Sequence, residues 1–149
     1  MGRKRAGSAE NSATTSAVPC GDPLMLVDTS IWVEHLRHNQ LRLVSLLHRE
    51  EVQCHPFIIG ELAGGSIIRR SEIRQLLRRL PSVPVVENEE VMTFVERHRL
   101  MGRGIGWVDA HLLASSVLAA VPFWSADRRL AAVARSLRVY GEPQLDPIS

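Results

Sequence analysis

Cysteine is scarce in this chain. Only Cys20 and Cys54 occur among its 149 residues, which is too few for a disulfide framework, and no histidine pair joins them at the spacing of a zinc site. Long apolar runs are also missing. The longest uncharged stretch, residues 110–126, contains Pro122 and three serines, so no segment is predicted to span a membrane. Together these absences predict a cytoplasmic protein.

Lysine is almost absent as well, since every one of the 18 basic residues except Lys4 is an arginine. The formal net charge is only +2, so any binding of nucleic acid must depend on local basic patches. The chain is 45% hydrophobic and 23% charged. This balance excludes a disordered chain and predicts one globular domain with a buried core.

Composition also predicts the limits of that domain. Residues 1–23 are rich in Gly, Ser, Ala, Thr and Asn and have no apolar periodicity. They are predicted to be a disordered N-terminal extension, or a foreign segment preceding a native start at Met25. Residues 24–142 are predicted to form the domain, and residues 143–149 a C-terminal tail.

From residue 24 onward, short apolar runs alternate with amphipathic segments. Strands are predicted at residues 24–28, 51–54, 83–86 and 122–124, with an edge strand at 138–140. Helices are predicted at residues 31–36, 41–49, 57–68, 72–80, 89–101, 107–120 and 127–137. Such an alternation predicts an α/β fold with a central parallel β-sheet and helices on both faces.

Three acidic residues interrupt apolar segments. Asp28 follows Leu-Met-Leu-Val, Glu61 lies within Phe-Ile-Ile-Gly-Glu-Leu-Ala, and Asp109 follows Gly-Trp-Val. A lone buried carboxylate is costly, and no arginine lies within two residues of any of the three. A fourth acid, Asp127, follows the apolar run at 122–124. Because the carboxyl ends of parallel strands meet at one edge, we expect these acids to share a cleft.

Two explanations of the acids remain open at this point. Each acid alone has a structural explanation as a helix cap, a turn residue, a helix-dipole partner or the partner of a distant arginine. Converging carboxylates would instead bind Mg²⁺ or Mn²⁺, which prefer oxygen ligands. One metal site accounts for all four acids with fewer coincidences.

Four segments carry a resemblance to a known family. They are Leu26-Val27-Asp28-Thr29-Ser30, Ile59-Gly60-Glu61-Leu62, the run Val108-Asp109-Ala110-His111-Leu112-Leu113-Ala114, and Ser125-Ala126-Asp127-Arg128-Arg129-Leu130. Over residues 24–140 the chain resembles a PIN domain. Its opening, Asp-Thr-Ser-Ile-Trp-Val-Glu-His-Leu, resembles the VapC ribonuclease toxins of bacterial VapBC toxin-antitoxin pairs.

This resemblance implies a PIN-like fold and a metal-dependent endoribonuclease, the toxin of a type II toxin-antitoxin system, that hydrolyses RNA with Mg²⁺ or Mn²⁺. A cognate VapB-like antitoxin would fill the groove and present a basic side chain to the acids. The implied catalytic and metal-binding quartet is Asp28, Glu61, Asp109 and Asp127, with Ser30 and Ser125 as supporting hydroxyls. Ser125 stands where threonine is commoner in the family.

Other residues are predicted to bind RNA or a second copy of the chain. The arginines nearest the acids are expected to contact phosphate or, alternatively, to form a solvated surface; they are Arg97, Arg99, Arg103, Arg128 and Arg129. Trp107 is expected to stack on an unpaired base, whereas Trp32 and Trp124 are expected in the core and His111 at the surface. Residues 41–47 favour a homodimer, although core burial explains the same apolar pattern.

Two other functions compete with the nuclease. One is a non-catalytic PIN-fold module that binds RNA or a partner, which the intact set of acids argues against. The other is a phosphatase in which Asp28 is the nucleophile. Such sites commonly need a second acid soon afterwards, and residues 29–32 contain none.

Overall fold

A small parallel sheet lies at the centre of the computed structural model, which describes residues 24–65 and 70–144. Its strands are β3 (Met25–Val27), β4 (Val52–Gln53) and β5 (Phe123–Trp124), in the order β4-β3-β5. The register pairs Met25 with Val52 and Leu26 with Phe123. Since all three strands run parallel, their carboxyl ends meet at one edge of the sheet, where the chain next reaches Asp28 and Ser125.

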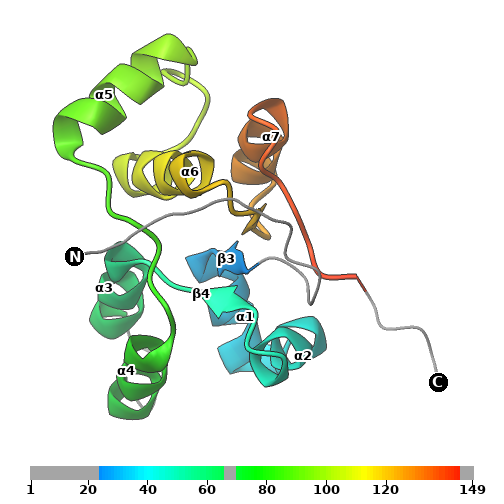
Figure 1. Cartoon of the computed structure of the whole chain (residues 1–149). Coiled ribbons are helices and arrows are strands. Elements are labelled where there is room, and N and C mark those ends of the chain that lie inside the picture. The colour runs from blue at the N-terminus through cyan, green and yellow to red at the C-terminus, as the bar shows by residue number, and fades with distance from the viewer. Residues whose placement is uncertain (1–23, 66–69, 145–149) are drawn as a thin grey trace, which may run out of the picture.

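Helices cover both sides of this sheet, as predicted. In Figure 1, α6 and α7 lie above the strands and α1 to α4 below them, while α5 packs on α6 farther from the sheet. None of the helices within the described ranges has both the length and the apolar character needed to cross a membrane. The helices are α1 (Thr29–His38), α2 (Leu41–His48), α3 (Pro56–Gly64), α4 (Arg70–Arg79), α5 (Asn88–Arg97), α6 (Trp107–Ala119) and α7 (Arg128–Ser136).

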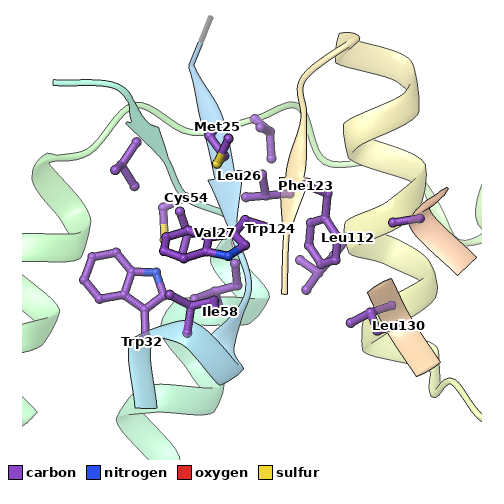
Figure 2. Close-up of a cluster of buried hydrophobic side chains, with 14 of the residues drawn as sticks. Met25, Leu26, Val27, Trp32, Cys54, Ile58, Leu112, Phe123, Trp124 and Leu130 are labelled. Atoms are coloured by element: carbon purple, nitrogen blue, oxygen red, sulfur yellow. The ribbon is translucent and has the colours of Figure 1, made fainter. Parts of the chain in front are cut away.

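The core forms around β3, all three residues of which are buried. Figure 2 shows Trp32, Cys54 and Ile58 on one side of this strand and Leu112 and Leu130 on the other. Trp32 and Trp124 are fully buried, which confirms their prediction as core residues. A strand this short is held by burial on both faces more than by its few ladder hydrogen bonds.

Two predicted strands are wrong. Residues 83–86 form no strand; the only pairing near them is a single bridge between Cys54 and Ser82. Pro84 lacks the N–H that a ladder needs, and the apolar pattern there reflects the buried side chains of Val83 and Val86. Likewise, the edge strand predicted at 138–140 is reduced to one bridge between Phe123 and Tyr140.

Helix boundaries differ from the predictions by a few residues. The helix predicted at 89–101 ends at Arg97 in α5, and Arg99 adopts a positive φ of 56°, a conformation that cannot continue a right-handed helix. Predicted helix residues 66–68 lie outside the described residues, as do the predicted extension 1–23 and residues 145–149 of the predicted tail.

Shortening Leu112 should destabilise the fold strongly. Its side chain is fully buried on α6, so Leu112→Ala should lower the free energy of unfolding by about 2–5 kcal/mol, through lost burial and the cavity left behind. Leu118→Ala is the matched control, because Leu118 lies on the same helix and is 66% exposed. Its effect should stay within about 0.5 kcal/mol. Equal effects of the two changes in urea denaturation would contradict this packing.

Candidate active site

Asp28 is held by two hydroxyls at the carboxyl edge of the sheet. Its side chain is buried, and its Oδ2 accepts hydrogen bonds from Ser30 Oγ at 2.6 Å and Ser125 Oγ at 2.9 Å. Ser125 reaches Asp28 because β5 pairs with β3, although the two residues are 97 positions apart. Asp28 is also the N-cap of α1. The sheet therefore brings together the predicted acid and both predicted supporting serines.

Asp109 lies in the first turn of α6, where its Oδ2 accepts a hydrogen bond from the backbone N–H of Gly106 at 3.0 Å. Burial raises the pKa of Asp109 above its ordinary value, and the Gly106 hydrogen bond partly opposes that rise. The negative charges of Asp28, Asp127 and Glu61 raise the pKa further. All four predicted acids therefore lie close enough to share one electrostatic environment.

The other two acids are tied to neighbouring helix starts. Asp127 is the N-cap of α7, with Oδ1 accepting from the backbone N–H of Arg129 at 2.9 Å and of Leu130 at 3.1 Å. Glu61, exposed on α3, accepts a hydrogen bond from Thr29 Oγ1 at 2.6 Å. Sequence reasoning missed the role of Thr29, although its place beside Asp28 was a signal.

The four carboxylates converge without forming a finished metal-ligand shell. Among the residues that the structure describes, no group of three or more His, Cys, Asp or Glu side chains is placed to hold a metal ion. Like charges repel at short range, and each carboxylate is turned toward its own protein donor.

The chemistry of this donor set nevertheless fits a hard divalent cation. It consists of carboxylates with hydroxyls behind them, which are the oxygen ligands that Mg²⁺ and Mn²⁺ prefer. Within the described ranges, ion pairs join Arg42 to Glu142 and Arg49 to Glu51, and neither involves one of the four acids. The negative charge of the cluster is therefore not compensated by an arginine.

The arginines predicted to bind RNA are all exposed, but no contact in the structure tests that role. Two of them connect the glycine turn at 102–106 to α7. Arg103 Nη1 donates to Ser136 Oγ at 3.4 Å, and the side chain of Arg129 lies against Gly104, where a Cβ would come within 2.8 Å of its Cδ. Gly104 also has a φ of +82°, which favours glycine.

His111 is not a surface residue, which corrects the prediction. Its side chain is 1% exposed, and its ring packs against Trp107 with the centroids 4.8 Å apart and against Phe57 at 4.7 Å. Trp107 itself is 44% exposed, as its predicted role requires. Sequence reasoning placed His111 by its polarity, whereas helix spacing puts it directly beside Trp107, four residues earlier.

Two sequence comparisons identify the family of this chain. Residues 25–136 match the PIN domain. The chain belongs to the VapC family of PIN-domain proteins. It is 49% identical over 110 residues to Ribonuclease VapC32 of Mycobacterium tuberculosis, in strain CDC 1551 / Oshkosh and in strain ATCC 25618 / H37Rv, which covers 73% of this chain and 89% of that protein.

One solved structure shows a weaker similarity to this chain. PAE2754 from Pyrobaculum aerophilum, a crystal structure, is 16% identical to the VapC-family chain described here, with a TM-score of 0.48 over 74% of this chain and 79% of that one.

His55 should make the stability of the protein depend on pH. It is fully buried and caps α3, with Nδ1 accepting the backbone N–H of Phe57 at 3.0 Å. Burial, together with the charge of His111, lowers the pKa of His55 to about 4. The folded protein thus binds this proton less readily than the unfolded chain. The free energy of unfolding should have its full value above pH 6.5. It should decrease by on the order of 3 kcal/mol as the pH drops toward 4.

Urea denaturation at a series of pH values measures this loss. His55→Asn keeps a capping oxygen but cannot titrate in this range, so its stability should change less between pH 6.5 and 5. His48→Asn, which removes an exposed histidine at the end of α2, should keep the wild-type slope. An unchanged slope in His55→Asn would assign the pH dependence to other groups.

Proposed function

We propose that this protein is a metal-dependent endoribonuclease, the toxin of a type II toxin-antitoxin pair, that hydrolyses RNA phosphodiester bonds. The observation that carries the proposal is the gathering of Asp28, Glu61, Asp109 and Asp127 at one edge of the sheet, with mutual effects on the pKa of Asp109 and no arginine partner among the described ion pairs. Relatives that are 49% identical carry the name ribonuclease.

The four acids would hold Mg²⁺ or Mn²⁺, because carboxylate oxygens are the ligands that these ions prefer. When bound, such an ion lowers the pKa of a coordinated water and neutralises charge that develops on the phosphoryl oxygens. The protein contributes orientation. Ser30 and Ser125 fix one oxygen of Asp28, and the Gly106 N–H fixes one oxygen of Asp109.

A carboxylate of the cluster would accept the proton of the attacking water. Asp109 suits this role because its raised pKa makes it a better proton acceptor than an ordinary aspartate, and Asp28 is the alternative. The exposed arginines beside the acids would hold the flanking phosphates. Arg128 and Arg129 follow Asp127 directly, Arg97 and Arg99 precede the glycine turn, and Arg103 lies within it.

The remaining features of the proposal concern assembly and location. We infer a catalytic unit of residues 24–142, working in the cytoplasm and inhibited by a cognate VapB-like antitoxin that would place a cation among the unpaired acids. A homodimer remains a proposal. Burial in the core accounts for Leu43 and Leu46 of α2, whereas Leu41 is 70% exposed and available to a second copy.

Asp109→Asn should abolish most RNA cleavage while leaving the fold intact. The amide keeps an oxygen that can accept the hydrogen bond from the Gly106 N–H. It removes the negative charge and the proton acceptor, so RNA cleavage should fall about a hundredfold or more. Gel analysis of RNA incubated with Mg²⁺ or Mn²⁺ measures this. Glu89→Gln, which neutralises an exposed acid of α5, should cleave normally.

Mapping of the RNA ends sharpens the same experiment. Attack by water leaves 5′-phosphate and 3′-hydroxyl ends, whereas attack by the ribose 2′-hydroxyl leaves a cyclic phosphate. Cyclic ends, or equal cleavage by Asp109→Asn and wild type, would refute the proposed chemistry. Absence of any cleavage with either ion would favour a non-catalytic RNA-binding or partner-binding module.

Divalent metal should stabilise the folded protein independently of RNA. An ion that binds the folded state alone raises the melting temperature in proportion to the logarithm of its concentration. We expect millimolar Mg²⁺ or Mn²⁺ to raise the melting temperature of the wild type and of Glu89→Gln, and to have a much smaller effect on Asp28→Asn. Because Asp28→Asn also perturbs the bonds to Ser30 and Ser125, the comparison is the shift on adding metal. Equal shifts in all three proteins would place the ion elsewhere.

A further inference from the structure

A pocket lies next to the start of α6, the helix that carries Asp109. It has a volume of about 300 Å³ and lies between α5, the glycine turn and the start of α6. Its walls are mainly apolar and include Met92, Met101 and Ile105, with Trp107 at the start of α6. We call it the α5–α6 pocket. Its volume is at the lower end of the range for small-ligand sites, so it suits one flat group and not a protein segment.

Trp107 is presented to this pocket as a rigid surface. Its ring is 44% exposed, yet the buried His111 meets it nearly at right angles, 86°, and Phe57 of α3 supports His111 from behind. Both ring nitrogens of His111 are buried without a hydrogen-bond partner among the described residues. The near-perpendicular ring contact holds the indole at a fixed angle to the buried His111 ring, which makes His111 a positioning residue for Trp107.

Gly106 and Ala110 connect the α5–α6 pocket to Asp109 of the proposed active site. Gly106 lines the pocket, and its backbone N–H donates to Asp109 Oδ2. Ala110, the residue after Asp109 on α6, lines it as well. A group in the pocket would therefore contact residues that flank Asp109 on both sides in the sequence. Glu96 brings the only charged side chain to the lining, and it can accept hydrogen bonds from a donor on the ligand.

We propose that the α5–α6 pocket receives one nucleobase next to the scissile phosphate, stacked on Trp107 and with its exocyclic amino group directed to Glu96. The inference rests on the proposed ribonuclease function and adds a specificity-determining pocket to it. Apolar walls and an indole match the faces of a base, and a carboxylate selects bases that carry an amino group. Adenine, cytosine and guanine, which carry an amino group, should be favoured over uracil.

Trp107 fluorescence provides a direct test. Trp32 and Trp124 are buried, so a ligand in the pocket should quench mainly Trp107. Octa-adenylate and octa-uridylate are titrated into the full chain in EDTA, which prevents cleavage. We expect quenching with tighter binding of octa-adenylate, and Trp107→Leu should remove the quenching and weaken octa-adenylate binding about five- to hundredfold. Leu118→Ala, at the exposed far end of α6, should bind as wild type.

Two further variants separate the roles of the pocket residues. Glu96→Gln should reduce the preference for octa-adenylate over octa-uridylate while stacking on Trp107 is retained. His111→Leu, which fills the same space without orienting the indole, should lower the quenching and raise KM for RNA with little change in kcat. Trp107→Phe should recover part of the binding lost in Trp107→Leu, because it restores an aromatic face.

The outcomes distinguish this inference from the function on which it rests. If RNA is cleaved with Mg²⁺ or Mn²⁺ but neither oligonucleotide quenches Trp107, the base pocket is overturned and the ribonuclease stands. Equal binding of both oligonucleotides by wild type and Glu96→Gln would overturn the role of Glu96. If Trp107→Leu changes the sedimentation coefficient and leaves RNA binding intact, the pocket is a protein interface and the inference fails.

Discussion

Uncompensated negative charge at one edge of a small sheet is the constraint on which this structure depends. Four carboxylates interact there, and the ion pairs found within the described ranges leave all four without an arginine. Carboxylates kept at close range without a cationic side chain are destabilising unless another positive potential offsets them. The chain supplies that potential from its backbone and its hydroxyl groups.

Helix starts provide most of the compensation. Asp28 caps α1, Asp127 caps α7, and Asp109 bonds to the N–H that precedes α6. The amino end of a helix carries a partial positive charge, so three of the four acids lie where the backbone tolerates an anion. The structural explanation as a helix cap therefore holds for Asp28 and Asp127, while the role of the acids as metal ligands stays part of the proposal. Capping positions the oxygens, and an ion would use the charge that remains.

The acids could be placed along the chain from the sequence more accurately than some of the strands. A carboxylate after an apolar run marks a strand end whatever the strand's exact limits, so Asp28 and Asp127 could be placed before the fold was known. The strand predicted at 83–86 is absent from the structure. A buried extended segment and a true strand have the same apolar pattern, so the pattern alone could not tell them apart. Pro84 was the sequence signal against a strand, because it lacks the N–H that a ladder of hydrogen bonds needs.

The prediction that His111 lies at the surface failed for a different reason, because residues from another helix decide whether its side chain is buried. A histidine next to apolar residues on a helix gives no sign of whether Phe57, from another helix, will cover it. The glycine turn is similar: the sequence shows that residues 102–106 are permissive, but only the fold brings Gly104 against Arg129 and opens a pocket between α5 and α6.

By itself the sequence determined the alternation of strands and helices and the places of the four acids along them, because these depend on local periodicity and on which residues tolerate burial. Only the tertiary structure decided that Ser125 meets Asp28, that Thr29 holds Glu61, and that Phe57 covers His111. Those contacts join residues up to 97 positions apart, and they exist only once the parallel strands have paired and the helices have packed around them.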